Sequence, residues 1–190
     1  MEEKIQKYID LLLEWNKKIN LIGASTIDDI HNRHILDCKQ ILDYVSENEM
    51  NNCCFGDFGS GAGLPGIILS IYGVKNIYLL EKSYRKCEFL NEAKKISDNK
   101  ISVINGNIFE LKHLKFDIIV SRALASLDKL FTMVQPFLKQ NTKCIFLKGE
   151  KYKIEIEEAL KTWNFDYELY DSKTSDSGKV VIVKNIKKII

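Results

Sequence analysis

From residue 53 onward, short apolar segments alternate with segments of helical spacing, and this alternation limits the possible folds more than any other feature of the sequence. The apolar segments are residues 53–58, 76–81, 101–104, 116–121 and 142–147. The segments of helical spacing lie between them, at residues 67–72, 84–96, 127–138 and 152–163. Strands that are apolar nearly throughout and alternate with helices are typical of a parallel sheet covered on both faces. The pattern therefore predicts an α/β fold.

The last part of the chain follows a different pattern. Residues 165–170 and 180–184 have the character of strands, and the polar segment 172–178 lies between them. Two strands joined in this way, without a helix between them, are expected to form an antiparallel hairpin with a long loop. Together with the five earlier strands, this predicts a mostly parallel seven-stranded sheet that ends in an antiparallel hairpin.

The first fifty residues are predicted to form two helices. One helical face is marked by apolar residues at the required spacing, Ile5, Ile9, Leu12 and Leu13. After a break at residues 20–23, a second helix is expected to begin at Ser25 or Thr26, because both are good N-cap residues. Its buried face would consist of Ile27, Ile30, His34, Cys38, Ile41 and Val45.

The polar run at residues 46–52 ends this second helix and is the most favourable place for a boundary. We therefore expect residues 1–52 to be an N-terminal helical extension packed on the core, and residues 53–190 to be the main domain. A chain of 190 residues suits one domain with an extension, forming a single compact unit.

Composition and the start of the chain bear on the cellular compartment. The chain is 45% hydrophobic and 28% charged, which excludes a disordered protein. Its apolar runs, such as residues 67–71 and 118–120, are too short to span a bilayer. The first five residues lack the basic and then apolar order of a secretory signal. We expect a cytoplasmic protein with no membrane partner.

The five cysteines fit the same compartment. They are Cys38, Cys53, Cys54, Cys87 and Cys144. Neither their spacing nor the three scattered histidines match a zinc motif, and an odd number favours free buried thiols. We predict no metal site.

The charge differs between the two parts of the chain. Residues 1–52 contain six basic and ten acidic residues, whereas residues 53–190 contain 22 basic and 16 acidic residues. A mildly basic C-terminal part can attract phosphates, but charge alone is too weak to identify a nucleic-acid partner.

The strongest motif is the glycine-rich segment from Asp57 to Gly66, which follows the first predicted strand and leads into a helix. A nucleotide-type cofactor docks at this position in a doubly wound sheet. Glycines are needed there because the backbone must turn tightly and approach the ligand closely. The same residues also match the G-x-G-x-x-G pattern of dinucleotide-binding proteins.

Asp57 distinguishes between a dinucleotide and a cofactor that carries positive charge. A carboxylate beside the turn would repel a pyrophosphate, whereas it would attract S-adenosylmethionine, which carries a sulfonium and an ammonium group. Glu81 ends the next strand, 22 residues after Gly59, where a carboxylate can accept hydrogen bonds from both ribose hydroxyls. An ion pair with Lys82 or Arg85 is the alternative for Glu81. By analogy with the fold, Ile108 and Phe109 would lie beside the adenine.

Arg122, at the end of the fourth strand, bears on the acceptor. The chain lacks the Asn/Asp-Pro-Pro-aromatic run of exocyclic amine methylation, and it has no cysteine between residues 88 and 143 for pyrimidine C5 methylation. A guanine ring nitrogen requires neither, because it has a free lone pair. Arg122 could hold the guanine O6 edge or a phosphate, or pair with Asp117 or Asp128 instead.

The place of four further residues in the pattern suggests a role for each. Lys148 closes the fifth strand, where it would meet an RNA phosphate or be exposed to solvent. His34 is expected in the core, with Asp37 holding its ring. Trp15 and Asn16 are expected to cap the first helix against the sheet.

Several separate motifs together resemble the glucose-inhibited division protein B family of bacteria. The resemblance covers nearly the whole chain and is carried by Trp15-Asn16 with Ile19-Asn20-Leu21, Arg33-His34-Ile35-Leu36-Asp37, Asp57 to Gly66, Ser121-Arg122-Ala123 and Leu147-Lys148-Gly149. Members of the family are 16S ribosomal RNA guanine-N7 methyltransferases. The resemblance therefore implies a class I S-adenosylmethionine-dependent methyltransferase with a Rossmann-like fold.

The resemblance also implies roles for single residues. Gly59 and Leu64 would contact S-adenosylmethionine, and Arg122 would lie near its reactive end. The complete set expected at the cofactor is Asp57, Gly59, Gly61, Gly63, Leu64, Glu81, Ile108, Phe109 and Arg122, and the expected catalytic residues are Arg122 and Lys148. Cys38 and Lys179 depart from the family pattern, which has Ser and Arg at these positions.

The implied partner is 16S ribosomal RNA, within the small ribosomal subunit or an assembly intermediate, with no obligate protein partner. The implied reaction is direct methyl transfer to guanine N7, without a covalent enzyme intermediate. Two other functions stay open from the residues alone: a small dinucleotide-dependent reductase, and an RNA-binding or ribosome-binding module without catalytic activity.

Overall fold

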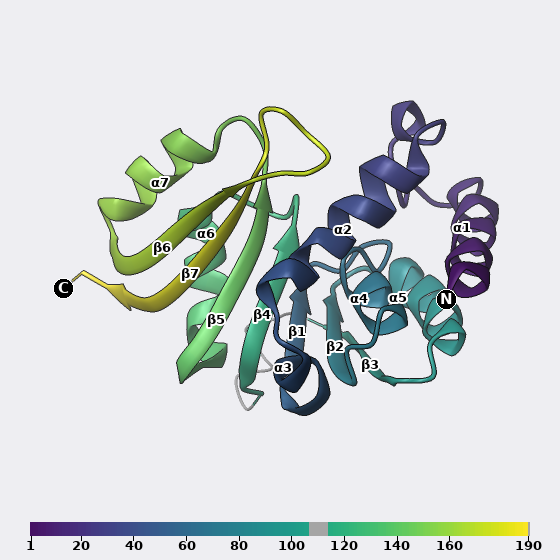
Figure 1. Ribbon diagram of the computed structural model, residues 1–190, viewed down its shortest axis with the longest axis horizontal. Coiled ribbons are helices and arrows are strands. Elements are labelled where there is room, and N and C mark those ends of the chain that lie inside the picture. The colour runs from purple at the N-terminus through teal and green to yellow at the C-terminus, as the bar shows by residue number, and fades with distance from the viewer. Residues whose placement is uncertain (107–113, 190) are drawn as a thin grey trace.

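A single seven-stranded sheet forms the centre of the computed structural model, which describes residues 1–106 and 114–189 (Figure 1). The strand order is β3-β2-β1-β4-β5-β7-β6. The strands are β1 (Phe55–Phe58), β2 (Asn76–Glu81), β3 (Lys100–Asn105), β4 (Phe116–Arg122), β5 (Leu138–Lys148), β6 (Trp163–Asp171) and β7 (Lys179–Lys188). The strands β1 to β5 pair in parallel, and β7 runs antiparallel to both β5 and β6. The predicted fold class is confirmed.

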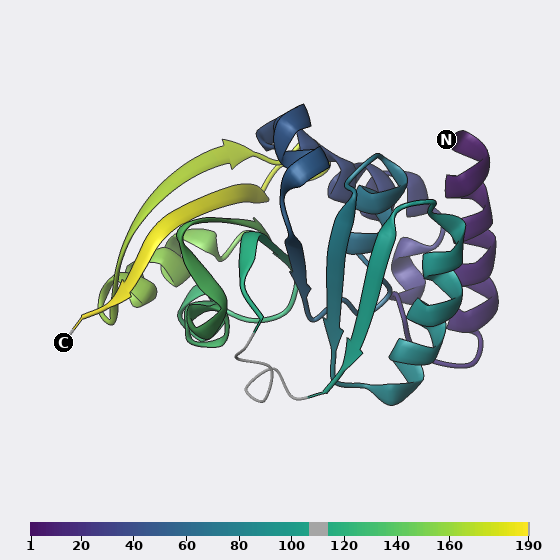
Figure 2. The ribbon, with the colours of Figure 1, turned by 90° about the horizontal axis from the view of Figure 1, so that it is seen from below.

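Helices cover both faces of the sheet (Figure 2). The helices α4 (Gly66–Ile71) and α5 (Tyr84–Ala93) lie on one face, followed along the chain by the short turn η4 (Lys94–Ile96). The other face carries α6 (Leu127–Val134), the turn η6 (Gln135–Phe137) and α7 (Tyr152–Leu160). Alternate residues of each strand enter two separate hydrophobic clusters. In β4, Ile118 and Val120 join the first cluster, and Ile119 joins the second.

The N-terminal helix α1 (Glu2–Asn16) packs on the outer side of α4 and α5 (Figures 1 and 2). Its buried residues belong to the same cluster as the face of the sheet beneath α4. The hydroxyl of the fully buried Tyr8 donates a hydrogen bond to the carbonyl of Ala62, 2.6 Å away. The first helix therefore supports the glycine-rich turn directly.

The second predicted helix differs from the expectation. Residues Ala24–Thr26 form a single 3₁₀ turn, η1, and the helical run begins only at His31, as the π-turn segment η2 (His31–Leu36). It continues as α2 (Asp37–Lys39) and the 3₁₀ segment η3 (Gln40–Tyr44). The backbone N–H of Asp37 bonds to the carbonyl of Asn32, as in a π-turn, while the carbonyl of Arg33 accepts from the side chain of Arg122. The carbonyl of Arg33 thus accepts from a distant side chain, whereas in a regular α-helix it would accept from the N–H of Asp37.

The polar run expected to end this region forms a helix of its own, α3 (Glu47–Asn52). Ser46 and Glu49 explain it, because each side chain accepts a hydrogen bond from the backbone N–H of the other. This reciprocal capping box makes a polar helix start stable. Glu49 also forms an ion pair with Lys143 of β5 at 2.7 Å, which fixes α3 against the sheet.

Trp15, near the end of α1, packs against the hydrophobic cluster that α5 and the sheet share. Its ring meets Phe89 of α5 edge to face, with 5.9 Å between ring centroids. Asn16 has the expected capping role, because its side-chain oxygen accepts from the backbone N–H groups of Leu21 and Ile22 at 2.8 and 3.0 Å. No helix in the two described ranges is long and apolar enough to cross a membrane.

The turn between β1 and α4 depends on a close approach at Gly66. Its backbone N–H donates to the Asp57 carboxylate at 3.0 Å, so the start of α4 lies against the end of β1. A β-carbon at Gly66 would lie 2.3 Å from Leu79 Cδ2 and 2.7 Å from Asp57 Oδ2. Both neighbours are fully buried. Only a glycine fits between them.

Substitution Gly66→Ala should therefore lower the free energy of unfolding by roughly 1–3 kcal/mol, as overpacking of a core does. Urea unfolding followed by circular dichroism measures this. Gly149→Ala is the matched control, because nothing lies within 4 Å of a β-carbon at Gly149. Equal stability of the two variants would contradict the close packing at Gly66.

Candidate active site

Two cavities open at the carboxyl edge of the parallel strands, where ligands bind in sheets of this type. The first, which we call the glycine cavity, has a volume of about 780 Å³. Its walls come from the ends of β1, β2, β3 and β4 and from α6, with the residues Gly59, Gly61, Leu80, Glu81, Lys82, Lys86, Gly106, Ala123, Leu124 and Met133. The structure thus brings together Gly59, Gly61 and Glu81 of the residues predicted to bind a cofactor.

Glu81 is held firmly at the wall of the glycine cavity. Its two carboxylate oxygens accept hydrogen bonds from the backbone N–H groups of Gly61 at 2.9 Å and Ser83 at 2.8 Å. The expected alternative of an ion pair with Lys82 or Arg85 is wrong. Each carboxylate oxygen has a second lone pair. Glu81 can therefore still accept hydrogen bonds from ligand hydroxyls.

The amides of the glycine turn are already bonded within the protein. The N–H groups of Gly59 and Ser60 donate to the carbonyl of Leu80, and that of Gly61 donates to Glu81. A pyrophosphate in a dinucleotide site relies on such amides at the turn and at the following helix start. At the start of α4, the amide of Gly66 donates to Asp57. The turn therefore fits a cofactor without phosphate, such as S-adenosylmethionine, better than a dinucleotide.

Asp57 lies behind this turn, fully buried. One of its oxygens accepts from Gly66, and the other, Oδ1, has no hydrogen-bond partner among the described residues. Burial raises the pKa of Asp57 to about 7, although the bond from Gly66 acts in the opposite direction. A cationic ligand in the neighbouring cavity would favour the ionised form, so this carboxyl suits a sulfonium or ammonium group.

Of the remaining residues expected at the cofactor, three do not line the glycine cavity and two lie outside the described residues. Gly63 and Leu64 are buried behind the turn and do not line the glycine cavity. Ile108 and Phe109 lie outside the described residues, so their expected place beside the adenine stays a prediction. Arg122 lines the other cavity.

Leu124 was missed by the sequence analysis and closes the glycine turn from the far side. A β-carbon at Gly59 would lie 2.5 Å from Leu124 Cδ1, and Gly59 itself has a φ of +70°. The neighbouring Ala123 also has a positive φ, 51°, which costs a residue with a β-carbon energy. No local sequence pattern marks Leu124, because its contact is with a turn more than sixty residues away.

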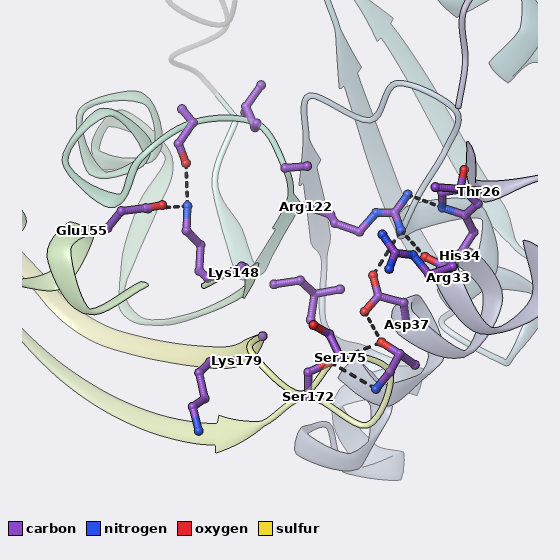
Figure 3. A pocket seen from close by; sticks show the side chains of 17 residues that line it. Thr26, Arg33, His34, Asp37, Arg122, Lys148, Glu155, Ser172, Ser175 and Lys179 are labelled. Atoms are coloured by element: carbon purple, nitrogen blue, oxygen red, sulfur yellow. Dashed lines mark hydrogen bonds and ion pairs between the residues drawn. The ribbon is translucent and has the colours of Figure 1, made fainter. Parts of the chain in front are cut away.

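The second cavity, which we call the arginine cavity, has a volume of about 550 Å³ and shares the walls Ala123 and Leu124 with the first. Figure 3 shows two groups of charged side chains on opposite sides of it. Arg122 with His34 and Asp37 lies on one side, and Lys148 with Glu155 lies on the other.

Arg122 is fixed by three acceptors from the N-terminal region. It donates to Asp37 Oδ2 at 3.1 Å, to the carbonyl of Arg33 at 3.0 Å and to His34 Nδ1 at 3.0 Å. The expected alternative partners, Asp117 and Asp128, bond instead to Lys139 and to the Trp163 ring nitrogen. A guanidinium has five N–H donors. Two donors therefore stay available to a ligand in the arginine cavity.

His34 is buried as expected, but its partners are not the expected ones. Because Nδ1 accepts from Arg122, the proton lies on Nε2, which donates to the Thr26 hydroxyl at 2.7 Å. Asp37 does not hold the ring. Its other oxygen accepts from the hydroxyl of Thr174, at 2.7 Å, in the loop between β6 and β7. The site thus joins three segments that are far apart in the sequence.

Lys148 is neither exposed nor free, contrary to one expectation. Its side chain is only 7% exposed and forms an ion pair with Glu155 of α7 at 2.5 Å. It also donates to the carbonyl of Ala125 at 2.7 Å, while Glu155 accepts from the N–H of Leu127. The pair therefore holds the loop that carries Ala123 and Leu124. Its predicted catalytic role stays a prediction.

The structure also shows where the two residues that depart from the family pattern lie. Cys38 is fully buried and lines neither cavity, and burial raises the pKa of its thiol to about 12. Lys179 lines the arginine cavity, pairs with Asp171 and lies over the ring of Tyr152.

Known proteins are similar to this chain over nearly its whole length. A family model described as rRNA small subunit methyltransferase G matches residues 1–181. The chain is 42% identical over 188 residues to the ribosomal RNA small subunit methyltransferase G of Rickettsia prowazekii (strain Madrid E), covering 99% of this chain and 96% of the relative. The protein of the same name from Rickettsia felis is also 42% identical, with coverages of 99% and 95%.

Solved structures share the fold at low sequence identity. The magnesium protoporphyrin IX methyltransferase of Synechocystis PCC 6803 superposes with a TM-score of 0.64 at 13% identity, covering 94% of this chain and 97% of that chain. The ribosomal protein L11 methylase of Lactobacillus delbrueckii subsp. bulgaricus superposes with a TM-score of 0.62 at 18% identity, with coverages of 78% and 76%.

The hydrogen bonds of His34 predict how stability depends on pH. Burial, assisted by the charge of Arg122, lowers the pKa of His34 from 6.5 to about 4. Between these values the unfolded chain binds a proton at His34 that the folded chain does not, so the contribution of His34 to stability falls as the pH is lowered from 6.5 toward 4. His34→Asn should remove up to about 1.4 kcal/mol per pH unit of this dependence. Urea titrations from pH 7 to pH 4.5 measure it.

His31→Asn is the control, because His31 is exposed on the same helical run. We expect its pH dependence to match that of the unsubstituted protein. If His34→Asn also kept the original dependence, the neutral, bonded state of His34 would be wrong.

Proposed function

The chain belongs to the rRNA small subunit methyltransferase G family, and from this premise we propose that it methylates ring nitrogen N7 of a guanine in 16S ribosomal RNA. Membership makes it an S-adenosylmethionine-dependent methyltransferase that acts on 16S rRNA. The position on the base, the residues that act and the form of the substrate belong to the proposal.

One observation carries the proposal: the glycine cavity and the arginine cavity meet at Ala123 and Leu124. S-adenosylmethionine would occupy the glycine cavity, with Glu81 accepting from the ribose hydroxyls and Asp57 supplying negative charge behind the turn. The cofactor supplies an electrophilic methyl group. A guanine in the arginine cavity would then face that group across the common wall, so alignment is the main contribution of the protein.

The side chains of the arginine cavity support an acceptor that needs no deprotonation. Its lining, taken from the described residues, contains no cysteine, and the carboxylates of Asp37 and Glu155 are engaged in ion pairs. Both ring nitrogens of His34 are hydrogen-bonded. Guanine N7 carries a lone pair and no proton, so it can attack directly without a covalent enzyme intermediate. Arg122 would donate to the O6 edge and so orient N7 toward the methyl group.

The structural environment gives Lys148 a positioning role in this proposal. Through Glu155 and Ala125 it would keep the common wall in place while base and cofactor are aligned. Residues 1–52 would act as an extension of the domain formed by residues 53–190, because they supply Asp37 and His34 to the arginine cavity.

We propose the small ribosomal subunit, or an assembly intermediate of it, as the substrate, and the cytoplasm as the compartment. The net charge of +2 is low for a protein that binds naked RNA without help. A folded ribosomal particle can present the guanine in a fixed position, which lowers the affinity that the enzyme itself must supply.

Transfer of a labelled methyl group from S-adenosylmethionine tests the proposal. Small subunits from cells that lack this enzyme are the acceptor, with stripped 16S RNA and an unrelated RNA as comparisons. We expect label at a single guanine whose ring becomes alkali-labile, as N7 methylation causes. Label on another atom would overturn the N7 assignment, and stronger labelling of stripped RNA would overturn the preference for the particle.

Glu81→Gln should weaken binding of S-adenosylhomocysteine. The glutamine amide cannot accept from both Gly61 and Ser83, and one acceptor for the ribose is lost. We expect the Kd to rise by about 10- to 100-fold, corresponding to the loss of a hydrogen bond to a charged group. Isothermal titration calorimetry measures it. Glu88→Gln, exposed on α5, removes the same charge and should leave the Kd unchanged. A Kd within about threefold of the original for Glu81→Gln would contradict the ribose role.

Arg122→Ala should lower kcat for methyl transfer by at least about tenfold, because a charge-assisted hydrogen bond made in the transition state is lost. Arg122→Lys keeps the charge near Asp37 but loses the planar fork, so it should also be slow. Cofactor affinity, measured by calorimetry, should change little for the lysine variant. A kcat within about threefold of the original in both variants would exclude Arg122 from the reaction.

A further inference from the structure

We infer that a basic groove between the end of α1 and the start of α5 binds the phosphate backbone of the RNA that carries the acceptor guanine. The groove has a volume of about 350 Å³, and four cations line it: Lys17, Lys18, Arg85 and Lys86. Its other described lining residues are uncharged, with the side chains of Asn16, Ile19, Asn20 and Ser83. The inference rests on the proposed function, because it takes RNA to be the substrate.

The cations of α5 lie at its N-terminus, where positively charged side chains destabilise a helix most. The N-terminus of a helix carries a partial positive charge, so a cation in the first turn is destabilising. Arg85 and Lys86 occupy the first turn of α5, and Lys82 lies just before its N-cap residue Ser83. That turn contains no acidic residue. Helix stability therefore does not explain these three cations, whereas binding of an anion does.

The groove cations are also free to bind a ligand. Lys17, Lys82, Arg85 and Lys86 form no ion pair with any residue of the described ranges, and Lys18 pairs only with the exposed Glu14. The arginine cavity differs, because three of its four lining cations, Arg122, Lys148 and Lys179, each have a carboxylate partner, and Arg33 alone has none among the described residues. Cations in ion pairs stabilise the folded protein. Cations without a carboxylate partner at one edge attract phosphates, and counterions are released on binding.

The groove continues into the active site. Lys86 lines both the basic groove and the glycine cavity, and Lys82 lines the glycine cavity beside Glu81. In Figure 2, α1 ends at the same lower edge at which β2 and β3 end and α5 begins. An RNA strand that places a guanine at Ala123 and Leu124 can therefore run along this edge, with its flanking phosphates over the groove.

An exposed aromatic residue, Tyr84, stands in sequence between the groove residues Ser83 and Arg85. Tyr84 lies between Lys82 and Lys86 in sequence and is 69% exposed. An aromatic ring among cations is the arrangement on which single-stranded RNA stacks its bases. The groove thus fits an RNA strand better than a free phosphate or an acidic protein, which would not use the ring.

The test measures binding of small ribosomal subunits, which carry the 16S RNA, in the presence of S-adenosylhomocysteine at several salt concentrations. The groove variant is the double substitution Lys17→Ala with Arg85→Ala, which avoids Lys82 and Lys86 because these line the glycine cavity. The control variant is Lys187→Ala with Lys188→Ala, at the end of β7, far from this edge and with the same loss of charge. All four residues are exposed, so both variants should fold.

We expect the groove variant to bind RNA roughly tenfold more weakly, and the slope of log K against log salt to fall by about 1.4, which corresponds to two phosphate contacts with a single strand. The control variant should keep the original slope and affinity. Both variants should bind S-adenosylhomocysteine with unchanged Kd. An unchanged slope in the groove variant, or an equal loss in the control variant, would overturn the inference.

Methyl transfer separates this inference from the proposed function. If the unsubstituted protein methylates 16S rRNA and the groove variant keeps the same KM and salt slope, only the groove is wrong. If the unsubstituted protein binds 16S RNA through the groove but transfers no methyl group to it, the proposed reaction is wrong and the groove stands.

Discussion

The backbone N–H of Gly66 donates a hydrogen bond to the buried carboxylate of Asp57. This single bond fixes the turn between β1 and α4 at the edge of the sheet where ligands bind. The carboxylate occupies the start of α4, the place where phosphate-binding folds hold an external anion. Because the protein supplies this anion itself, the chain must turn around it, and Gly66 has no room for a side chain. The same arrangement leaves negative charge behind the glycine cavity, which suits a cationic cofactor. Fold and cofactor choice therefore have one common cause.

The wall between the two cavities is held from three directions. Leu124 packs against Gly59, Arg122 is bonded to the N-terminal region, and the carbonyl of Ala125 accepts from Lys148. A segment with a positive φ at Ala123 can persist only when its surroundings fix it in this way. The charged residues of the arginine cavity thus contribute to precise positioning, and their pairing explains why they were difficult to assign from sequence.

The sheet and its helices could be predicted from residue 53 onward because most of the parallel strands are rich in apolar residues and the helices between them have a regular period. The ends of the strands placed Gly59, Glu81 and Arg122 at the carboxyl edge of the sheet, where Gly59 and Glu81 line the glycine cavity and Arg122 lines the arginine cavity. The second N-terminal helix could not be predicted in detail, since its π-turn depends on the bond between Arg122 and the carbonyl of Arg33. The partners of Asp37 and Lys148 depend in the same way on Thr174 and Glu155, which lie far along the chain. Hydrophobic periodicity and local motifs carry no information about contacts between residues that are far apart in the sequence.

The bond between Asp37 and Thr174 joins residues 137 positions apart and has a consequence for the order of folding. Closing a long loop costs entropy before the contact repays it, so contacts of this kind form late. The glycine turn, by contrast, is built from β1, β2 and their immediate connections. During folding, the glycine turn can therefore form before the contacts of the arginine cavity do, but the glycine cavity is complete only when Ala123 and Leu124 reach it. Both cavities are properties of the completed molecule, because they share this wall, and a half-folded chain has neither.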